Sequence, residues 1–150
     1  MQFNNLTCQE NEMKAIFFHA DRFGFKVESP SKRLGGTKPE EAESLSLDVR
    51  ECLAALFHVE EADGEYQVRR LCKDIKRIAE RVGATRLVVA AFGHLSDSYA
   101  PPSVAMEISR QVVESCRGWG YEVHTSPFGH NKTLVLHCKG HPDAVKHRGY

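Results

Sequence analysis

The sequence predicts an α/β fold in a single domain, with a mixed sheet packed with helices. Two adjacent patterns carry this prediction. Residues 67–83 repeat apolar side chains with the period of an amphipathic helix, and residues 85–92 form an apolar run typical of a buried strand. A helix, a glycine and a buried strand in this order are expected of an α/β layer. The chain has 150 residues, about one domain's worth, and neither a linker nor an internal repeat divides it.

The composition is that of an ordinary globular domain. Hydrophobic residues make up 41% of the chain, which supplies a core and excludes general disorder. No apolar run reaches the ~18–20 residues of a membrane span, so we expect no membrane partner. Lys and Arg number 20 and Asp and Glu number 20, so the basic footprint of a whole nucleic-acid-binding domain is absent. The five cysteines are widely spaced without a CxxC pair, which predicts reduced thiols and a cytoplasmic location.

The N-terminal stretch differs from the rest of the chain. Residues 1–12 are polar and lack the basic and apolar regions of a secretory signal, and Met13 resembles a second start. We therefore interpret residues 1–12 as a flexible N-terminal extension or a misassigned start. The domain itself is expected over residues 13–150.

Two strands and a loop are expected next. Residues 14–20 form a short apolar run, and residues 23–29 alternate apolar with other side chains, so both are typical of strands. Asp21 and Arg22 between them predict a turn, and hence a hairpin. Residues 30–47 contain Pro, Gly-Gly and an acidic run, which indicates a long surface loop.

The centre of the chain holds the clearest patterns. Residues 52–60 fit either a helix or a strand by periodicity, and the turn signal at Asp63 and Gly64 favours a buried strand. The helix over 67–83 ends at Gly83, where a left-handed cap is expected. The buried strand over 85–92 follows directly.

A second helix and two more strands complete the expected elements. The helix begins after Pro101 and Pro102 and ends at Gly118. Strands are predicted over 121–129 and 132–140, with His130 and Asn131 in the connection between them. The remaining tail shows no strong pattern.

The charges are distributed unevenly along the chain. The segment from Glu40 to Glu65 is strongly acidic, whereas the segment from Phe128 to Tyr150 is basic and rich in histidine. The basic segment fits either contact with a phosphate or an ordinary solvated surface.

The C-terminal histidines invite comparison with a zinc site. The candidates are His124, His130, His137, Cys138 and His141. Zinc needs three or four converging ligands, but no close cysteine pair is present. Because His137 and Cys138 are adjacent on a presumed strand, they point to opposite faces. We therefore expect no metal and no cofactor. No Walker loop, GxGxxG, GxSxG or HExxH motif occurs either.

Two polar loops carry the stronger functional signal. FGHLS places His94 and Ser96 just after the strand at 85–92, and strand ends in α/β folds commonly hold functional groups. SPFGHNK places Lys132 at the start of the next strand. Taken alone, His94 equally fits a loop histidine bonded to a carbonyl, and Lys132 fits a solvent lysine.

Four ordered blocks then make the sequence recognisable. They are MKAIFFHADRFGFKVE at 13–28, AAFGHLSDSYAPPSVAMEI at 90–108, SPFGHNKT at 126–133 and CKGHP at 138–142. Together they span nearly everything after residue 12. The sequence resembles the archaeal-type N-terminal editing domain of threonyl-tRNA synthetase, either as a free-standing relative or as an excised piece, and its altered tail favours the former.

This resemblance implies a fold, an activity and a set of residues. The fold is that of the D-aminoacyl-tRNA deacylases, which usually pair as homodimers. The activity is hydrolysis of serine wrongly esterified to threonine tRNA, assisted by a hydroxyl of the terminal ribose. Lys132 and His94 would be catalytic. The residues implied to bind substrate are His19, Asp21, Ser96, Pro127, Phe128, Gly129, His130 and Asn131. The implied partners are the aminoacyl-adenosine end of tRNA and a separate synthetase catalytic subunit.

The chemistry agrees with these residues. An aminoacyl ester is already activated, so a placed water and charge stabilisation of the oxyanion suffice, and a lysine can supply that charge. Serine is smaller than threonine by one methyl. A synthetic site discriminates only modestly against a missing methylene, so a second sieve that excludes the larger cognate is the physical solution.

The chain also departs from the family pattern. His130 and Asn131 replace the aromatic residues that often precede the lysine, and Val145 stands where a glutamate follows the His-Pro pair. These departures keep two alternatives open. One is a weakly active or non-catalytic module that binds tRNA or adenosine. The other is a deacylase for a different aminoacyl group, including a D-amino acid.

Overall fold

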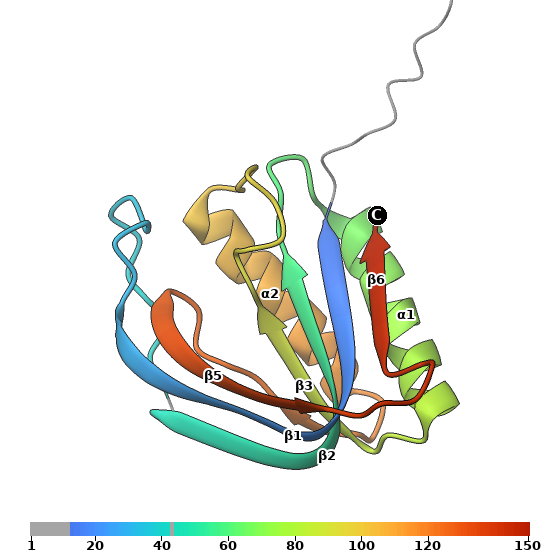
Figure 1. The fold of residues 1–150 in the computed structure, drawn as a ribbon. Helices are drawn as coiled ribbons and strands as arrows, with labels where there is room; N and C mark the ends of the chain where they lie inside the picture. Colours follow the sequence, from blue (N-terminus) through green and yellow to red (C-terminus); the bar gives the residue numbers. More distant parts are fainter. Residues whose placement is uncertain (1–12, 43) are drawn as a thin grey trace, which may run out of the picture.

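The computed structural model describes residues 13–42 and 44–150, so the expectation for residues 1–12 lies outside it (Figure 1). Its elements in chain order are β1 (Lys14–Pro30), β2 (Ser46–His58), α1 (Glu65–Val82), β3 (Arg86–Ala91), α2 (Pro102–Arg117), β4 (Glu122–His124), β5 (His130–Cys138) and β6 (Val145–Gly149). Within the described ranges, no helix is long and apolar enough to cross a membrane.

The strands form one mixed sheet, which confirms the predicted fold class. Their order is β4-β3-β2-β1-β5, with β6 also paired to β1. β2, β3 and β4 are parallel neighbours, whereas β1 is antiparallel to β2, β5 and β6. The first part of β1 pairs with β6 and its second part pairs with β5, so both C-terminal strands share one edge of β1.

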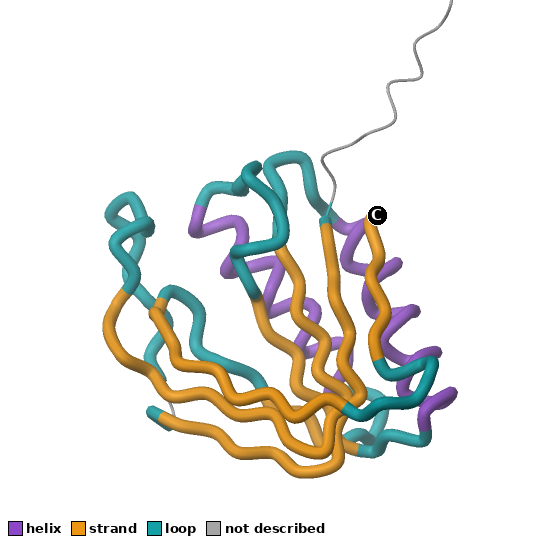
Figure 2. The backbone as a smooth tube through the Cα atoms, in the orientation of Figure 1, coloured by secondary structure: helices purple, strands orange, loops and turns teal. Residues whose placement is uncertain are grey.

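Both helices cover the same face of the sheet (Figure 2). The buried stripe of α1 includes Leu71, Ile75 and Ile78, which pack against Leu53 and Leu87 of the central strands. The helix predicted over 67–83 is confirmed and begins slightly earlier, at Glu65. As predicted, its C-cap Gly83 is left-handed, with a φ of 71°.

The predicted hairpin around Asp21 and Arg22 is wrong, because β1 runs through both residues without a turn. β1 pairs with β2 on either side of this point, at Ala20 and again at Arg22. The charged side chains find partners within the sheet: Arg22 pairs with Asp48 at 2.9 Å and Asp21 pairs with Lys139. Because these ion pairs satisfy the charges, Asp21 and Arg22 can lie within a continuous strand. The chain does not reverse there, and the pairing with β5 only shifts its register.

The C-terminal strands also differ from expectation. The strand predicted over 121–129 is confined to β4, at the opposite edge of the sheet from β5. His130 and Asn131 open β5 and do not form a connection. The tail forms β6, which the sequence did not predict. This edge strand is mostly exposed and lacks an alternating apolar pattern, so its pairing with β1 is not visible locally.

The sheet bends strongly, so that β1, β2 and β5 curl away together from the central strands (Figure 1). The bend coincides with Asp21 of β1 and with its neighbour Glu51 of β2, which has a positive φ of 46°. A second apolar cluster, separate from the one beneath the helices, includes Phe23, Val49 and Leu56. The curled part of the sheet forms one wall of a groove.

Candidate active site

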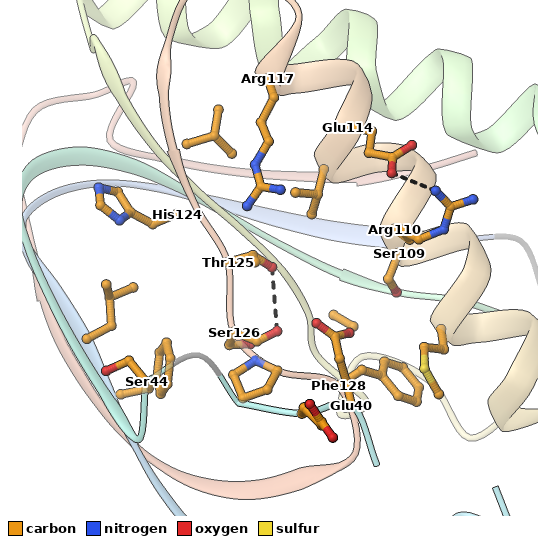
Figure 3. Close-up of a pocket in the computed structure, with 18 of the residues that line it drawn as sticks. Glu40, Ser44, Ser109, Arg110, Glu114, Arg117, His124, Thr125, Ser126 and Phe128 are labelled. Atoms are coloured by element: carbon orange, nitrogen blue, oxygen red, sulfur yellow. Dashed lines mark hydrogen bonds and ion pairs between the residues drawn. The ribbon is translucent and has the colours of Figure 1, made fainter. Parts of the chain in front are cut away.

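A groove of about 640 Å³ lies between the curled part of the sheet and α2 (Figure 3). The sheet contributes Phe25 and Leu47, and the end of β3 contributes Ala91. The rest of the wall comes from the loop before β2, from α2 and from the segment after β4. Residues from these parts include Glu40, Ser44, Met106, Arg110, Arg117, His124, Thr125, Ser126, Pro127 and Phe128.

The sheet topology brings the FGHLS and SPFG blocks to the same end of the molecule. β3 and β4 are adjacent parallel strands, with Val88 opposite His124. The segments that follow them therefore leave the sheet at the same end, beyond the carboxyl ends of the strands. This is the usual place for ligand sites in α/β folds. As a result, Ala91 and the pair Pro127 and Phe128 line one groove.

A three-bond clamp fixes the loop before β2 onto the PFG segment. The Ser31 amide donates to the Gly129 carbonyl at 2.8 Å, and the Glu40 amide donates to the Phe128 carbonyl at 2.9 Å. His130 Nε2 donates to the Glu40 carbonyl at 2.8 Å. Gly129 has a φ of 89°, and a Cβ there would lie 3.1 Å from Pro39 Cα, so this close approach requires glycine.

Lys132 lies beside this clamp, opposite Val27 of β1. Burial lowers the pKa of Lys132 to about 8, and the nearby Glu40 carboxylate offsets only part of this effect. No hydrogen bond to the Lys132 ammonium occurs in residues 13–42 and 44–150. At neutral pH the ammonium is therefore charged, partly desolvated and available to a ligand.

His94 lies on the exposed turn after β3. Its ring packs edge-on against Phe92, with 4.9 Å between ring centroids. The turn is held from within, because Tyr99 Oη donates to the Gly93 carbonyl at 2.8 Å and Ser96 Oγ accepts from the Ser98 amide at 3.1 Å. Neither His94 nor Ser96 lines the groove.

His19 and Asp21 belong to a different cluster, at the bend of β1. Asp21 pairs with Lys139, which also pairs with Glu51 at 2.9 Å, and His19 Nδ1 lies 2.7 Å from His141 Nε2. A hydrogen bond from Lys139 lowers the pKa of Asp21. Burial, together with the nearby charges of His141 and Lys139, lowers the pKa of His19.

The cluster around Asp21 and the Lys132 side chain lie at different points along β1 and are far apart within one copy of the chain. Asp21 and the Val27 partner of Lys132 are roughly 20 Å apart along β1, at ~3.3 Å per residue. Val145 is farther still, since it pairs with Phe18, roughly 30 Å along β1 from Val27. The acid that the family carries at the Val145 position would therefore not lie beside Lys132 within one copy of this chain.

His130 and Asn131, expected to bind substrate, make hydrogen bonds within the protein. The His130 ring holds the Glu40 carbonyl, and Asn131 Nδ2 donates to Ser29 Oγ at 3.1 Å. Of the residues implied by the resemblance, Pro127 and Phe128 line the groove and Gly129 holds its loop. Within the described ranges, no group of three or more His, Cys, Asp or Glu side chains is arranged to hold a metal.

Glu40 was not found by sequence reasoning. Its carboxylate lines the groove next to Lys132, and no ion pair to it is formed within the part of the chain that the structure describes. In the sequence it is one acid of a long acidic loop, and only the contact with Phe128 distinguishes it. Glu40 lines the groove, whereas Lys132 lies near Glu40 without being one of the residues that line the groove. An anion and a cation close together suit a ligand that carries both a positive group and a polarisable carbonyl.

Comparisons with known proteins identify the family of the chain. The model of the archaea-specific editing domain of threonyl-tRNA synthetase matches residues 13–148. A threonine–tRNA ligase from Thermococcus kodakarensis is 35% identical over 133 residues, and one from Methanopyrus kandleri is 33% identical over the same length. Each alignment covers 87% of this chain and 21% of the ligase, so the chain spans about a fifth of the length of these relatives.

Solved structures show the same fold at low sequence identity. A c-Myc DNA unwinding element binding protein aligns with a TM-score of 0.66 and 11% identity, covering 91% of this chain and 98% of that one. A probable eukaryotic D-amino acid tRNA deacylase aligns with a TM-score of 0.63 and 8% identity, covering 92% and 99%. The predicted deacylase-like fold is therefore confirmed.

Proposed function

Because the chain belongs to the family of archaea-specific editing domains of threonyl-tRNA synthetase, we propose that it proofreads translation by hydrolysing mischarged aminoacyl-tRNA. The leading substrate is serine esterified to threonine tRNA. The observation that carries the proposal is the Lys132 ammonium, held partly desolvated and without a hydrogen-bond partner in the described chain, beside a groove of suitable size. Such a charge stabilises the oxyanion that forms when water attacks an ester carbonyl.

The proposed reaction needs no protein nucleophile. Water adds to the ester carbon, and the carbonyl oxygen becomes an oxyanion that the Lys132 ammonium stabilises. A hydroxyl of the terminal ribose assists as a proton relay, accepting the proton of the water while it passes its own proton to the departing ribose oxygen. The tetrahedral intermediate then collapses, and the bond between the ester carbon and that ribose oxygen breaks. The products are the free amino acid and the uncharged tRNA.

Glu40 is proposed to bind the α-ammonium group of the substrate. An aminoacyl ester carries this positive group one carbon away from the carbonyl, and the Glu40 carboxylate lies close to Lys132 at the groove wall. The Phe128 and His130 contacts fix the Glu40 backbone. The pair of charges would thus orient the ester, with its amino group toward Glu40 and its carbonyl toward Lys132.

His94, for which the resemblance implies a catalytic role, does not line the groove, so here it is proposed to contact the terminal adenosine from the neighbouring turn. Its exposed ring lies against Phe92 at the end of β3, whose Ala91 lines the groove. The proposed sieve excludes threonine because of its additional methyl group. Pro127 and Phe128 in the groove wall are the candidates for blocking this methyl. A single methylene is worth about 1–3 kcal/mol in such a pocket.

The expected homodimer belongs to the same proposal. β5 has β1 on one side only, and Leu134, Val135 and Leu136 in this strand are each more than 40% exposed. An open, apolar edge strand of this kind favours pairing with another copy. Sedimentation of the purified protein tests the dimer directly.

A threonyl-tRNA synthetase would be the source of the mischarged substrate in the cytoplasm.

The decisive experiment is hydrolysis of a panel of labelled aminoacyl-tRNAs. The panel contains Ser-tRNA(Thr), Thr-tRNA(Thr) and D-aminoacyl-tRNAs. Release of serine without release of threonine supports the leading proposal. Hydrolysis of another member of the panel alone would make that aminoacyl-tRNA the substrate in place of Ser-tRNA(Thr). Binding without hydrolysis of any member would identify a binding module.

A further inference from the structure

The outward face of α1 is strongly basic although the chain as a whole is neutral. The cationic side chains of this helix are Arg69, Arg70, Lys73, Lys76, Arg77 and Arg81, all exposed, against the acids Glu65, Asp74 and Glu80. Arg69, Lys73 and Arg77 follow one another at four-residue intervals, so they form a row along the face opposite the buried stripe. We call these three residues, together with Lys76 beside them, the α1 basic surface.

The neighbouring acids form no ion pair with this row in the described chain, although Glu65 lies one helical turn from Arg69 and Glu80 lies one turn from Arg77. Asp74 accepts a hydrogen bond from Tyr150 Oη at 2.7 Å and lies 4.0 Å from Arg148 of β6. Asp143 is held by Arg81 at 3.2 Å and by Lys146 at 3.0 Å. Within residues 13–42 and 44–150, no acid lies within ion-pair distance of the α1 basic surface.

The second helix shows how different this is from an ordinary solvated helix. On α2, Arg110 lies 2.5 Å from Glu107 and 2.6 Å from Glu114, so its charge is balanced on both sides. On α1, by contrast, Lys76 lies over the ring of Trp119 at 5.8 Å, an interaction that leaves its positive charge unneutralised. The α1 basic surface therefore keeps a net positive charge, since its cations outnumber the adjacent acids of the helix.

The shape of the surface fits a nucleic-acid backbone. A helix of 18 residues is about 27 Å long, and a duplex carries a phosphate charge about every 1.7 Å of its axis, so several phosphates fall within reach. β6 extends the surface, because it lies beside α1 and exposes His147 and Arg148 (Figure 1).

We propose that the α1 basic surface binds the phosphate backbone of duplex RNA, namely the helical stem next to the aminoacylated end of the substrate tRNA. The identity of the RNA rests on the proposed function. The binding itself rests on the charges of α1 and is measurable without any hydrolysis. The groove would then hold the single-stranded end, and the surface of α1 would hold the stem.

The test compares two triple variants that each remove three positive charges. Arg69→Gln, Lys73→Gln and Arg77→Gln alter the α1 basic surface, and Lys32→Gln, Arg33→Gln and Lys38→Gln alter exposed residues of the loop before β2. Binding of an uncharged RNA hairpin is measured by fluorescence anisotropy over a range of salt concentrations. We expect the α1 variant to bind at least tenfold more weakly and its salt slope to fall by ~2–3, about one per lost phosphate contact. The loop variant should keep the wild-type slope.

Three outcomes would overturn the proposal. These are a wild-type affinity and slope in the α1 variant, an equal loss in the loop variant, or wild-type binding to vesicles of phosphatidylcholine and phosphatidylglycerol without binding to RNA. Should the triple variant unfold, Lys73→Gln alone is expected to lower the slope by ~1. Hydrolysis of a seryl ester of adenosine separates the two proposals. If the wild type hydrolyses neither this ester nor seryl-tRNA, the proposed function fails. The RNA-binding measurement then still tests whether the α1 basic surface binds RNA.

Discussion

The amide of Glu40 donates a 2.9 Å hydrogen bond to the carbonyl oxygen of Phe128, and this bond joins two segments far apart in the sequence. It places an acid of the loop before β2 next to Lys132, which follows Phe128 in the family motif. The proximity of the Glu40 carboxylate to the Lys132 ammonium therefore depends on the backbone of the PFG segment and on Gly129, which lets the loop approach it.

Replacing Lys132 by methionine should lower deacylation by ~100-fold or more, the scale expected for removal of one oxyanion donor. The variant should remain folded, and its melting temperature at pH 7 should not fall, because burial disfavours the charged ammonium in the folded state. Single-turnover rates and thermal unfolding measure the two effects. Unchanged turnover would remove Lys132 from the mechanism.

The rate should fall as the pH rises through about 8. Burial lowers the pKa of Lys132 to about 8 in the folded protein, so the ammonium is present below this pH and lost above it. Because the proposed step needs the ammonium, kcat/KM follows its protonation. A rate that instead rises through pH 8 would assign the neutral amine as a base and contradict the oxyanion role.

Substitution Glu40→Gln should raise KM for seryl-tRNA about tenfold, because it removes the negative partner proposed for the α-ammonium. Glu28→Gln is the matched control. Glu28 accepts a hydrogen bond from Thr133 at 2.8 Å, and Thr133, next to Lys132 on β5, points to the opposite face of the sheet.

An N-acetylated substrate sharpens this comparison, since it lacks the positive amino group. The wild type should bind it as weakly as the Glu40→Gln variant does. If acetylation weakens binding equally in wild type and variant, Glu40 does not contact the amino group.

Gly129→Ala should destabilise the protein by about 1–3 kcal/mol and lower its activity. The residue has a φ of 89°, and the added Cβ would lie 3.1 Å from Pro39 Cα, so the loop that carries Glu40 has to move. Gly140→Ala is the control, because a Cβ there meets nothing within 4 Å. Denaturant unfolding measures both variants, and equal stability of the two would show that the clamp tolerates a side chain.

The sequence by itself determined the local elements with strong periodicity. The amphipathic stripe of α1, the left-handed cap at Gly83 and the buried β3 depend on neighbouring residues only, so their patterns are visible in the chain. The ordered FGHLS, SPFGHNK and CKGHP blocks likewise identified the family. The same blocks point to Lys132 as a candidate, and the structure adds the burial that lowers its pKa.

The tertiary structure decided everything that depends on long-range pairing. Asp21 and Arg22 read as a turn in sequence, but distant partners, Lys139 and Asp48, satisfy their charges and keep β1 continuous. β6 has no apolar alternation because its side chains are mostly exposed, so only its backbone pairing with β1 makes it a strand. The row on α1 is local to one helix, whereas the neighbourhood of Glu40 and Lys132 exists only once segments separated in the chain are brought together, since their proximity is a property of space and not of sequence order.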